Sequence, residues 1–160
     1  MLVYHPAYDS YHCITRILKI LKFLNVKEYN IDRIRIYDYY LLFLNDIENI
    51  TLPRDLYNYK NLVQSNRYNK VDNPSYVFSQ LENVQNIALR AIASFGFIDK
   101  DLFDKEIIQL NKVELPNDLL PELTTIEIEY MSFINSFFEK ISLRELKQRT
   151  KLMEYRYELS

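Results

Sequence analysis

The chain has 160 residues, the size of one ordinary domain and enough to bury a core without disulfides. Apolar residues make up 48% and charged residues 26%, with a formal net charge of -2, which is typical of a soluble globular protein. The single glycine excludes the glycine-rich loops that bind phosphate, and the single cysteine excludes internal disulfides and multi-cysteine metal sites.

Apolar residues recur at helical spacing along most of the chain. In chain order, the expected helices are Asp9 or Ser10 to Asn25, Asn30 or Asp32 to Leu44, one that opens at Pro53, Pro74 to Phe95, a short one behind Asp99 that carries Ile107, Thr125 to Ile141, and Ser142 to Lys151. The longest begins after Asn73 and stops before Gly96. This residue is the only glycine, and glycine suits a left-handed helix terminus. Ser142 and Glu145 have the spacing of a capping box.

Alternating apolar and charged residues predict short strands at both ends of the chain. They fall at Leu2 and Tyr4 and again from Met153 to Glu158, and Lys112 to Leu115 is a further candidate. We therefore expect a mainly α-helical single domain over residues 1–160, with a small sheet built from the terminal strands. A degenerate winged-helix element between residues 99 and 141 is an alternative within this fold class.

The chain offers little for catalysis or metal binding. His12 and Cys13 are adjacent, but neighbours on a helix point about 100° apart and do not readily hydrogen-bond to each other. His5, Asp9 and His12, with Asp38, match no known ligand spacing. We expect no catalytic residue, no metal and no cofactor, with catalysis through His12 or Cys13 as an alternative.

Tyrosine and arginine side chains outside the expected core are candidates for a protein interface, because these residue types dominate interface hot spots. Ile34, Tyr37 and Leu41 occupy the core stripe of their helix, so Tyr39 and Tyr40 are expected to point to other faces. The alternative is that the tyrosines cap the core with their hydroxyls in water. The partner-interface candidates are Tyr8, Tyr11, Arg33, Arg35, Tyr39, Tyr40, Arg149, Tyr155 and Arg156.

A DNA-binding winged-helix regulator is the alternative function. Two helix faces carry several cations, with Arg16, Lys19 and Lys22 on one and Lys147, Arg149 and Lys151 on the other. Charged helix faces are usually only solvated, however. Residues 99–129 hold nine acidic and three basic residues, which would repel phosphates.

Four blocks taken together, in order, carry a resemblance to a known family. They are residues 4–13, residues 32–43, residues 84–89 leading to 96–99, and residues 149–157. The set resembles the middle component of bacterial ABC-three-component systems, the small accessory subunit of Lamassu-type anti-phage defence. Two positions depart from the family pattern: Leu44 stands where we expect a proline, and Lys151 where we expect a glycine.

The resemblance implies a non-enzymatic adaptor subunit. Its partners would be an SMC/Rad50-like ABC ATPase that senses DNA and an effector, often a nuclease, and the adaptor would couple the two. Direct contact with DNA would be weak or indirect, and no small-molecule substrate is implied. The N-terminal residues have no basic segment typical of targeting peptides, and we expect a cytoplasmic protein without a membrane span.

Overall fold

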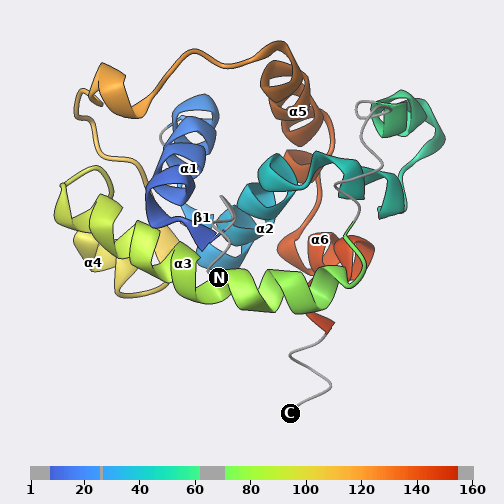
Figure 1. The fold of residues 1–160 in the computed structure, drawn as a ribbon, viewed down its shortest axis with the longest axis horizontal. Coiled ribbons are helices and arrows are strands. Elements are labelled where there is room, and N and C mark those ends of the chain that lie inside the picture. The colour runs from blue at the N-terminus through green and yellow to red at the C-terminus, as the bar shows by residue number, and fades with distance from the viewer. Residues whose placement is uncertain (1–7, 26, 62–70, 155–160) are drawn as a thin grey trace, which may run out of the picture. The chain divides into compact units, whose positions relative to one another are not determined.

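The computed structural model describes residues 8–25, 27–61 and 71–154 (Figure 1). The α-helices within them are α1 (Ser10–Leu24), α2 (Ile31–Leu42), α3 (Pro74–Ser94), α4 (Lys100–Phe103), α5 (Thr125–Ser136) and α6 (Leu143–Thr150). The 3-10 helices are η2 (Leu44–Asn49), η3 (Arg54–Asn61), η5 (Asn117–Leu119) and η6 (Phe138–Lys140), and the strands are β1 (Tyr29–Asn30) and β2 (Ile107–Ile108). The expected mainly α-helical fold class is confirmed.

The chain forms two compact units. Unit 1 comprises Met1–Asp38 and Leu81–Glu122, and unit 2 comprises Tyr39–Gln80 and Leu123–Ser160. Helices α2 and α3 therefore each begin in one unit and end in the other.

In unit 1, α1 begins and ends as the sequence predicts. The side chain of Asp9 accepts hydrogen bonds from the backbone N–H groups of Tyr11 and His12, which satisfies two donors of the first turn. The helix ends before Asn25, which adopts a positive φ of 63°. Ile17 and Leu21 on its inner face are fully or almost fully buried. This amphipathic stripe fixes which α1 side chains face the interior of unit 1.

The C-terminus of α3 is stopped by the lone glycine. Gly96 has a φ of +82°, a left-handed conformation that an L side chain adopts only with strain. Its N–H donates to the carbonyl of Ala93, and the N–H of Phe97 donates to the carbonyl of Ile92. These two bonds form the Schellman motif expected at a helix that ends in glycine. The side-chain amide of Asn111 also donates to the Gly96 carbonyl.

The small sheet lies in unit 1 and uses strands that the sequence did not indicate. β1 and β2 pair antiparallel, with Tyr29 opposite Ile108 and Asn30 opposite Ile107. The expectation that Ile107 continues the helix behind Asp99 is therefore wrong. That helix, α4, has only four residues and is followed by Glu106, which has a positive φ of 62°.

The other predicted strands either are not formed or lie outside the described residues. Lys112 to Leu115 forms no strand. Met153 and Glu154 are likewise not in a strand, while the rest of that candidate and the pair Leu2 and Tyr4 lie outside the described residues. Every residue of the 99–141 segment is described, and its one strand, β2, pairs with β1 rather than with a neighbour in the same segment. The segment therefore lacks the hairpin that forms the wing of a winged helix.

Unit 2 has an aromatic core. The ring of Phe133 packs against Phe138 with centroids 4.8 Å apart, and Tyr40 packs against Phe138 at 5.7 Å. Tyr39 and Tyr40 meet edge to face at 5.0 Å. Such tilted and T-shaped arrangements are the favoured aromatic contacts. Buried tyrosine and phenylalanine rings therefore fill this core.

The predicted helix over 125–141 is interrupted. α5 begins with a capping box, in which Thr124 accepts from the N–H of Glu127 and the Glu127 carboxylate accepts from the N–H of Thr124. Phe137 then leaves the helical region with φ -132° and ψ -63°, and the chain continues as η6. Pro53 likewise precedes a 3-10 helix, η3, rather than an α-helix.

Helix α6 begins where the sequence predicts, with Ser142 accepting from the N–H of Glu145. It ends at Lys151, which has φ 58° and ψ 14° and is thus left-handed. The glycine expected here from the family pattern would suit this conformation, and lysine adopts it in its place.

Candidate functional site

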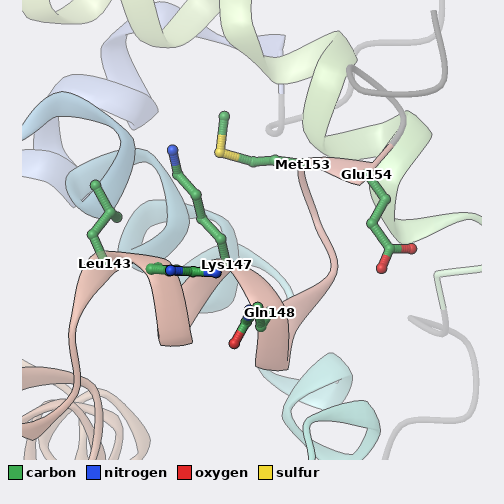
Figure 2. A pocket seen from close by; sticks show the side chains of 6 residues that line it. Leu143, Lys147, Gln148, Met153 and Glu154 are labelled. Atoms are coloured by element: carbon green, nitrogen blue, oxygen red, sulfur yellow. The ribbon is translucent and has the colours of Figure 1, made fainter.

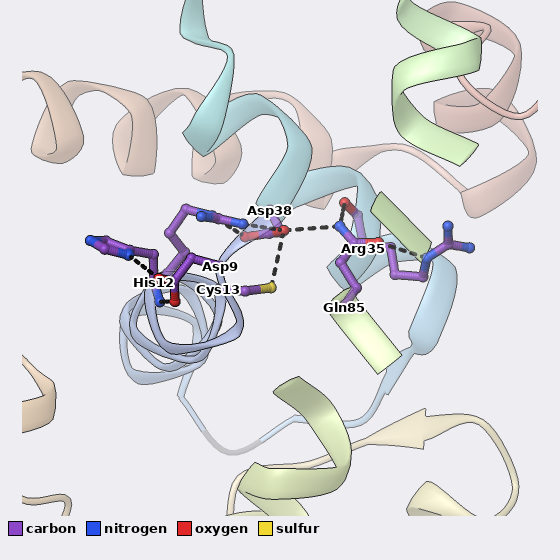
Figure 3. Close-up of polar contacts among 7 residues, drawn as sticks. Asp9, His12, Cys13, Arg35, Asp38 and Gln85 are labelled. Atoms are coloured by element: carbon purple, nitrogen blue, oxygen red, sulfur yellow. Dashed lines mark hydrogen bonds and ion pairs between the residues drawn. The ribbon is translucent and has the colours of Figure 1, made fainter. Parts of the chain in front are cut away.

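The structure brings together five polar side chains in unit 1 that the sequence did not group. Figure 3 shows this Asp38 cluster, formed by Cys13, Arg16, Arg35, Asp38 and Gln85. Cys13, Asp38 and Gln85 are 0% exposed, and Arg16 and Arg35 are 9% and 3% exposed. A buried carboxylate needs such partners, because an unpaired ionised group in the interior is costly.

Asp38 is the common acceptor of the cluster. Its Oδ1 accepts from Nε of Arg16 at 2.7 Å, and its Oδ2 accepts from Nη2 of Arg16 at 3.3 Å and from Nε2 of Gln85 at 2.9 Å. Burial alone would lower the pKa of the Arg16 guanidinium, but the Asp38 carboxylate holds that pKa above its ordinary value. Two guanidinium nitrogens of Arg16 thus reach the two carboxylate oxygens of Asp38, which makes the contact bidentate.

Gln85 extends the cluster from α3 to the second arginine. Its Oε1 accepts from Nε of Arg35 at 2.8 Å, and its Nε2 also donates to the backbone carbonyl of Arg35 at 3.1 Å. Arg35 lies 3.6 Å from the carboxylate of Asp32 as well. The cluster thus joins α1, α2 and α3 within unit 1 by side chains whose polar atoms bond to one another.

The side chains of the adjacent residues His12 and Cys13 lie in different surroundings. The Cys13 thiol is buried and donates to Oδ2 of Asp38 at 3.7 Å, whereas the His12 side chain is 51% exposed and lies 3.5 Å from the Asp9 carboxylate. Burial raises the pKa of the Cys13 thiol, and the nearby Asp38 charge raises it further. The thiol is therefore held protonated, as is typical of a cysteine in apolar surroundings.

The placement expected for the tyrosines of α2 is wrong. Tyr39 is fully buried, and Tyr40 is 1% exposed. The Tyr39 hydroxyl donates to Oδ2 of Asp46 at 2.8 Å, so the buried polar tip has a partner inside unit 2. Burial raises the pKa of both hydroxyls, with a further rise from the Asp46 charge. These rings are core residues in this chain.

The arginines named as interface candidates are largely engaged within the chain. Arg35 is buried in the Asp38 cluster, and Arg33 donates to the Tyr37 hydroxyl at 3.0 Å. Arg149 donates to the carbonyl of Thr51 at 2.7 Å, and its guanidinium lies 5.3 Å from the Phe137 ring centroid. Whether any of them also contacts a partner stays a prediction.

Two of the aromatic candidates lie at the surface. Tyr8 and Tyr11 are 54% and 55% exposed, at the start of α1. The Tyr11 ring meets the His12 ring edge to face at 6.0 Å. Tyr155 and Arg156 lie outside the described residues. The candidate set therefore divides into two exposed tyrosines, core tyrosines, engaged arginines and two undescribed positions.

One predicted basic face is also wrong. Arg16 was grouped with Lys19 and Lys22 on the outer face of α1, but its guanidinium is buried against Asp38. Its partner comes from a helix 22 positions away in the sequence, so spacing along α1 alone does not indicate the pairing.

A groove is built on α6 in unit 2. Its lining residues are Leu143, Arg144, Lys147, Gln148, Met153 and Glu154, around a volume of about 460 Å³. Figure 2 shows Leu143 and Lys147 rising from α6 and Met153 reaching over from the segment that follows it. This volume lies within the range of small binding sites.

Neither a metal centre nor a membrane span is found in the part of the chain that the structure describes. Its histidine, cysteine and carboxylate side chains do not gather in groups of three or more that would hold a metal ion. None of its helices is long and apolar enough to cross a bilayer.

Comparison with known families gives one match. A family model described as ABC-three component (ABC-3C) system Middle Component 5 matches residues 2–158. Comparisons with curated proteins and with solved structures give no match. The family match spans nearly the whole chain, so it covers the Asp38 cluster and the α6 groove alike.

Proposed function

We propose that this chain, which belongs to the Middle Component 5 family of ABC-three component systems, is an adaptor that couples an ABC ATPase to an effector within such a system. The family match over residues 2–158 carries the proposal. Membership itself makes the chain an accessory component that works with other components. The ATPase and effector as its direct partners are the proposed step.

In this proposal the ATPase is of the SMC/Rad50-like type and senses DNA, and the effector is a nuclease held inactive or released through the adaptor. The four sequence blocks that resemble the Lamassu accessory subunit support an anti-phage role. The chain supplies contact surfaces and no catalytic group of its own. The burial of Cys13 against Asp38 and the raised pKa of its thiol support that assignment.

The exposed tyrosines at the start of α1 have the chemistry of a partner contact. Tyr8 and Tyr11 lie three positions apart and are both exposed. Tyrosine is enriched at interfaces because it combines a large apolar ring with a polar tip and loses little side-chain entropy. The Asp38 cluster is not such a surface, because its side chains are buried against one another.

The test is co-expression with the ATPase and effector encoded beside this chain, followed by gel filtration. We expect the three to migrate together at micromolar concentration. The double variant Tyr8→Ser with Tyr11→Ser should weaken the complex, whereas Tyr57→Ser with Tyr76→Ser, at tyrosines 52% and 44% exposed in unit 2, should not. Independent migration of the wild-type chain would contradict the adaptor role.

Two controls separate the alternatives. A DNA-binding regulator would bind duplex DNA alone with a steep salt dependence, so tight binding at about 50 mM salt that is lost on adding salt would favour it. An effector acting through His12 or Cys13 would lose cellular activity in the double variant His12→Ala with Cys13→Ser. The adaptor proposal expects activity to be kept in that variant while the fold stays intact.

A further inference from the structure

We propose that the α6 groove is the docking site for an acidic amphipathic helix of another component of the system. The groove is the set of six residues named above, from Leu143 to Glu154. This inference rests on the proposed function, since it assigns a surface and a chemistry to one of the contacts that an adaptor must make.

The groove is a product of the local fold. Leu143, Arg144, Lys147 and Gln148 stand at positions i, i+1, i+4 and i+5 of α6, which places them on one face of the helix. Leu146 lies on the opposite side and is fully buried in unit 2. The left-handed Lys151 then reverses the chain, which brings Met153 and Glu154 to the other edge of the groove.

The lining combines an apolar base with a cationic rim. Met153 is 5% exposed and forms the base with the half-buried Leu143. Methionine adapts its shape to the side chain that packs on it. Arg144 and Lys147 place two cations beside this base, against one carboxylate from Glu154. An apolar side chain flanked by carboxylates is the complementary ligand.

The cations of α6 lie on two different sides of the helix. Arg149 faces its own unit, where it bonds to the carbonyl of Thr51 and to the carboxylate of Glu145. Glu145, the acidic residue of α6, is therefore paired with Arg149 and is not among the residues that line the groove. Arg144 and Lys147 line the groove itself. The groove lining thus holds two cations and one carboxylate, which favours a partner that carries negative charge.

A helix of a protein fits this groove better than nucleic acid does. Phosphate recognition calls for cations and backbone amides, whereas the base of this groove is apolar and one edge carries the Glu154 carboxylate. Apolar grooves that receive the hydrophobic face of an amphipathic helix are a common recognition mode. The cationic rim favours a negatively charged partner helix. The apolar base would accept one apolar side chain of that helix as its anchor.

The experiment measures the dissociation constant between this chain and the co-expressed ATPase and effector, by biolayer interferometry on the purified full-length proteins. The test variant is Arg144→Glu with Lys147→Glu, and the matched control is Lys100→Glu with Lys105→Glu, a pair of exposed cations in unit 1. We expect the test variant to bind one of the two partners about 100-fold more weakly and the control to bind as the wild type does.

A second variant distinguishes the loss of a partner contact from the loss of the fold. Gln148→Glu adds a negative charge to the exposed rim without removing a cation, and we expect it to weaken the same partner by about tenfold. Circular dichroism and the melting temperature should match those of the wild type.

The outcomes distinguish the two levels of the proposal. If the wild-type chain binds neither partner, the proposed function itself fails. If it binds and both groove variants bind equally well, only the groove assignment fails. The assignment is also overturned if the control pair weakens binding as much, if the groove variants abolish self-association instead, or if they abolish binding to a duplex DNA probe instead.

Discussion

Asp38 is the single residue on which most of the buried polar bonding of unit 1 converges. Four atoms donate to its carboxylate, from Arg16, Gln85 and Cys13. Removing one member of a buried ion pair leaves the other charge without compensation. We predict that Asp38→Ala lowers the free energy of unfolding by about 3–5 kcal/mol, as measured by urea denaturation.

The matched comparison is the double variant Arg16→Met with Asp38→Leu. It removes both charges and keeps the volume apolar, and such replacements of buried pairs are often neutral or stabilising. We expect it to be more stable than Asp38→Ala alone. If the two variants are equally unstable, packing rather than the unpaired Arg16 charge accounts for the loss.

Asp46 gives unit 2 a pH dependence of defined sign. Burial raises the pKa of its carboxyl above the ordinary value of 3.8, hydrogen bonds from Asn49 and Tyr39 offset part of the rise, and Glu48 adds to it. The folded chain therefore binds this proton more tightly than the unfolded chain does. Ionisation of Asp46 costs stability, and the cost grows as the pH rises from the unfolded pKa through the raised folded pKa.

The variant Asp46→Asn removes that cost. We predict that the free energy of unfolding of the variant, minus that of the wild type, increases as the pH rises from the ordinary Asp pKa of 3.8 through the raised pKa of folded Asp46, and is constant above it. Urea denaturation of both proteins at a series of pH values measures the difference, which cancels the titration of all other groups. A difference that does not change with pH, or that falls, would contradict the assignment.

Residue-level burial was the least predictable property from sequence. The periodicity of α2 was correct for Ile34 and Tyr37, but Tyr39 and Tyr40 are buried as well because aromatic partners in unit 2 cover them. The helical spacing of α1 places Arg16 on the same face as surface cations. Its side chain is nevertheless buried, because it pairs with Asp38 from α2. Such contacts depend on neighbours from other helices, which the periodicity within one helix does not indicate.

At the level of elements, caps were predictable and strand pairs were not. Asp9 or Ser10, Asp99 and Ser142 were expected at helix N-termini, and Asp9, Asp99 and Ser142 each accept a hydrogen bond from the first turn of their helix. Capping is local, since the cap and its donor lie two or three residues apart. The pairing of Tyr29 with Ile108 joins distant positions in strands of two residues, too short for an alternating pattern.

The end of α6 offers a test of backbone conformation in isolation. Lys151 is exposed and left-handed, with φ 58°, a conformation that costs an L residue about 1 kcal/mol and glycine almost nothing. We predict that Lys151→Gly raises the free energy of unfolding by about 1 kcal/mol. Thermal and urea unfolding would measure the gain.

The reverse substitution at α3 is the matched control. Gly96 has φ +82°, and a Cβ at this position would meet no atom within 4 Å. Gly96→Ala therefore adds backbone strain without a clash and should lower stability by about the same amount. A neutral effect at Lys151 together with a loss at Gly96 would mean that a lysine side-chain contact offsets the strain at the end of α6.

At the scale of the whole molecule, two helices belong to both units. α2 passes from unit 1 to unit 2 between Asp38 and Tyr39, and α3 passes from unit 2 to unit 1 between Gln80 and Leu81. Helix hydrogen bonds join residues four apart, so melting one half of either helix removes partners from the turn at the junction with the other half. The single domain expected from chain length therefore stays a prediction with a physical basis in these shared helices.

Hydrogen exchange tests that prediction directly. If the units unfold as one, Asp38→Ala in unit 1 should lower the protection of α5 amides in unit 2 by the same free energy as that of α1 amides in unit 1. Mass spectrometry of peptides from both helices, in the wild type and the variant, measures the two changes. Thr124→Ala, which removes a cap of α5, supplies the converse perturbation from unit 2. Loss of protection confined to the unit that carries each substitution would show two independently unfolding domains joined by α2 and α3.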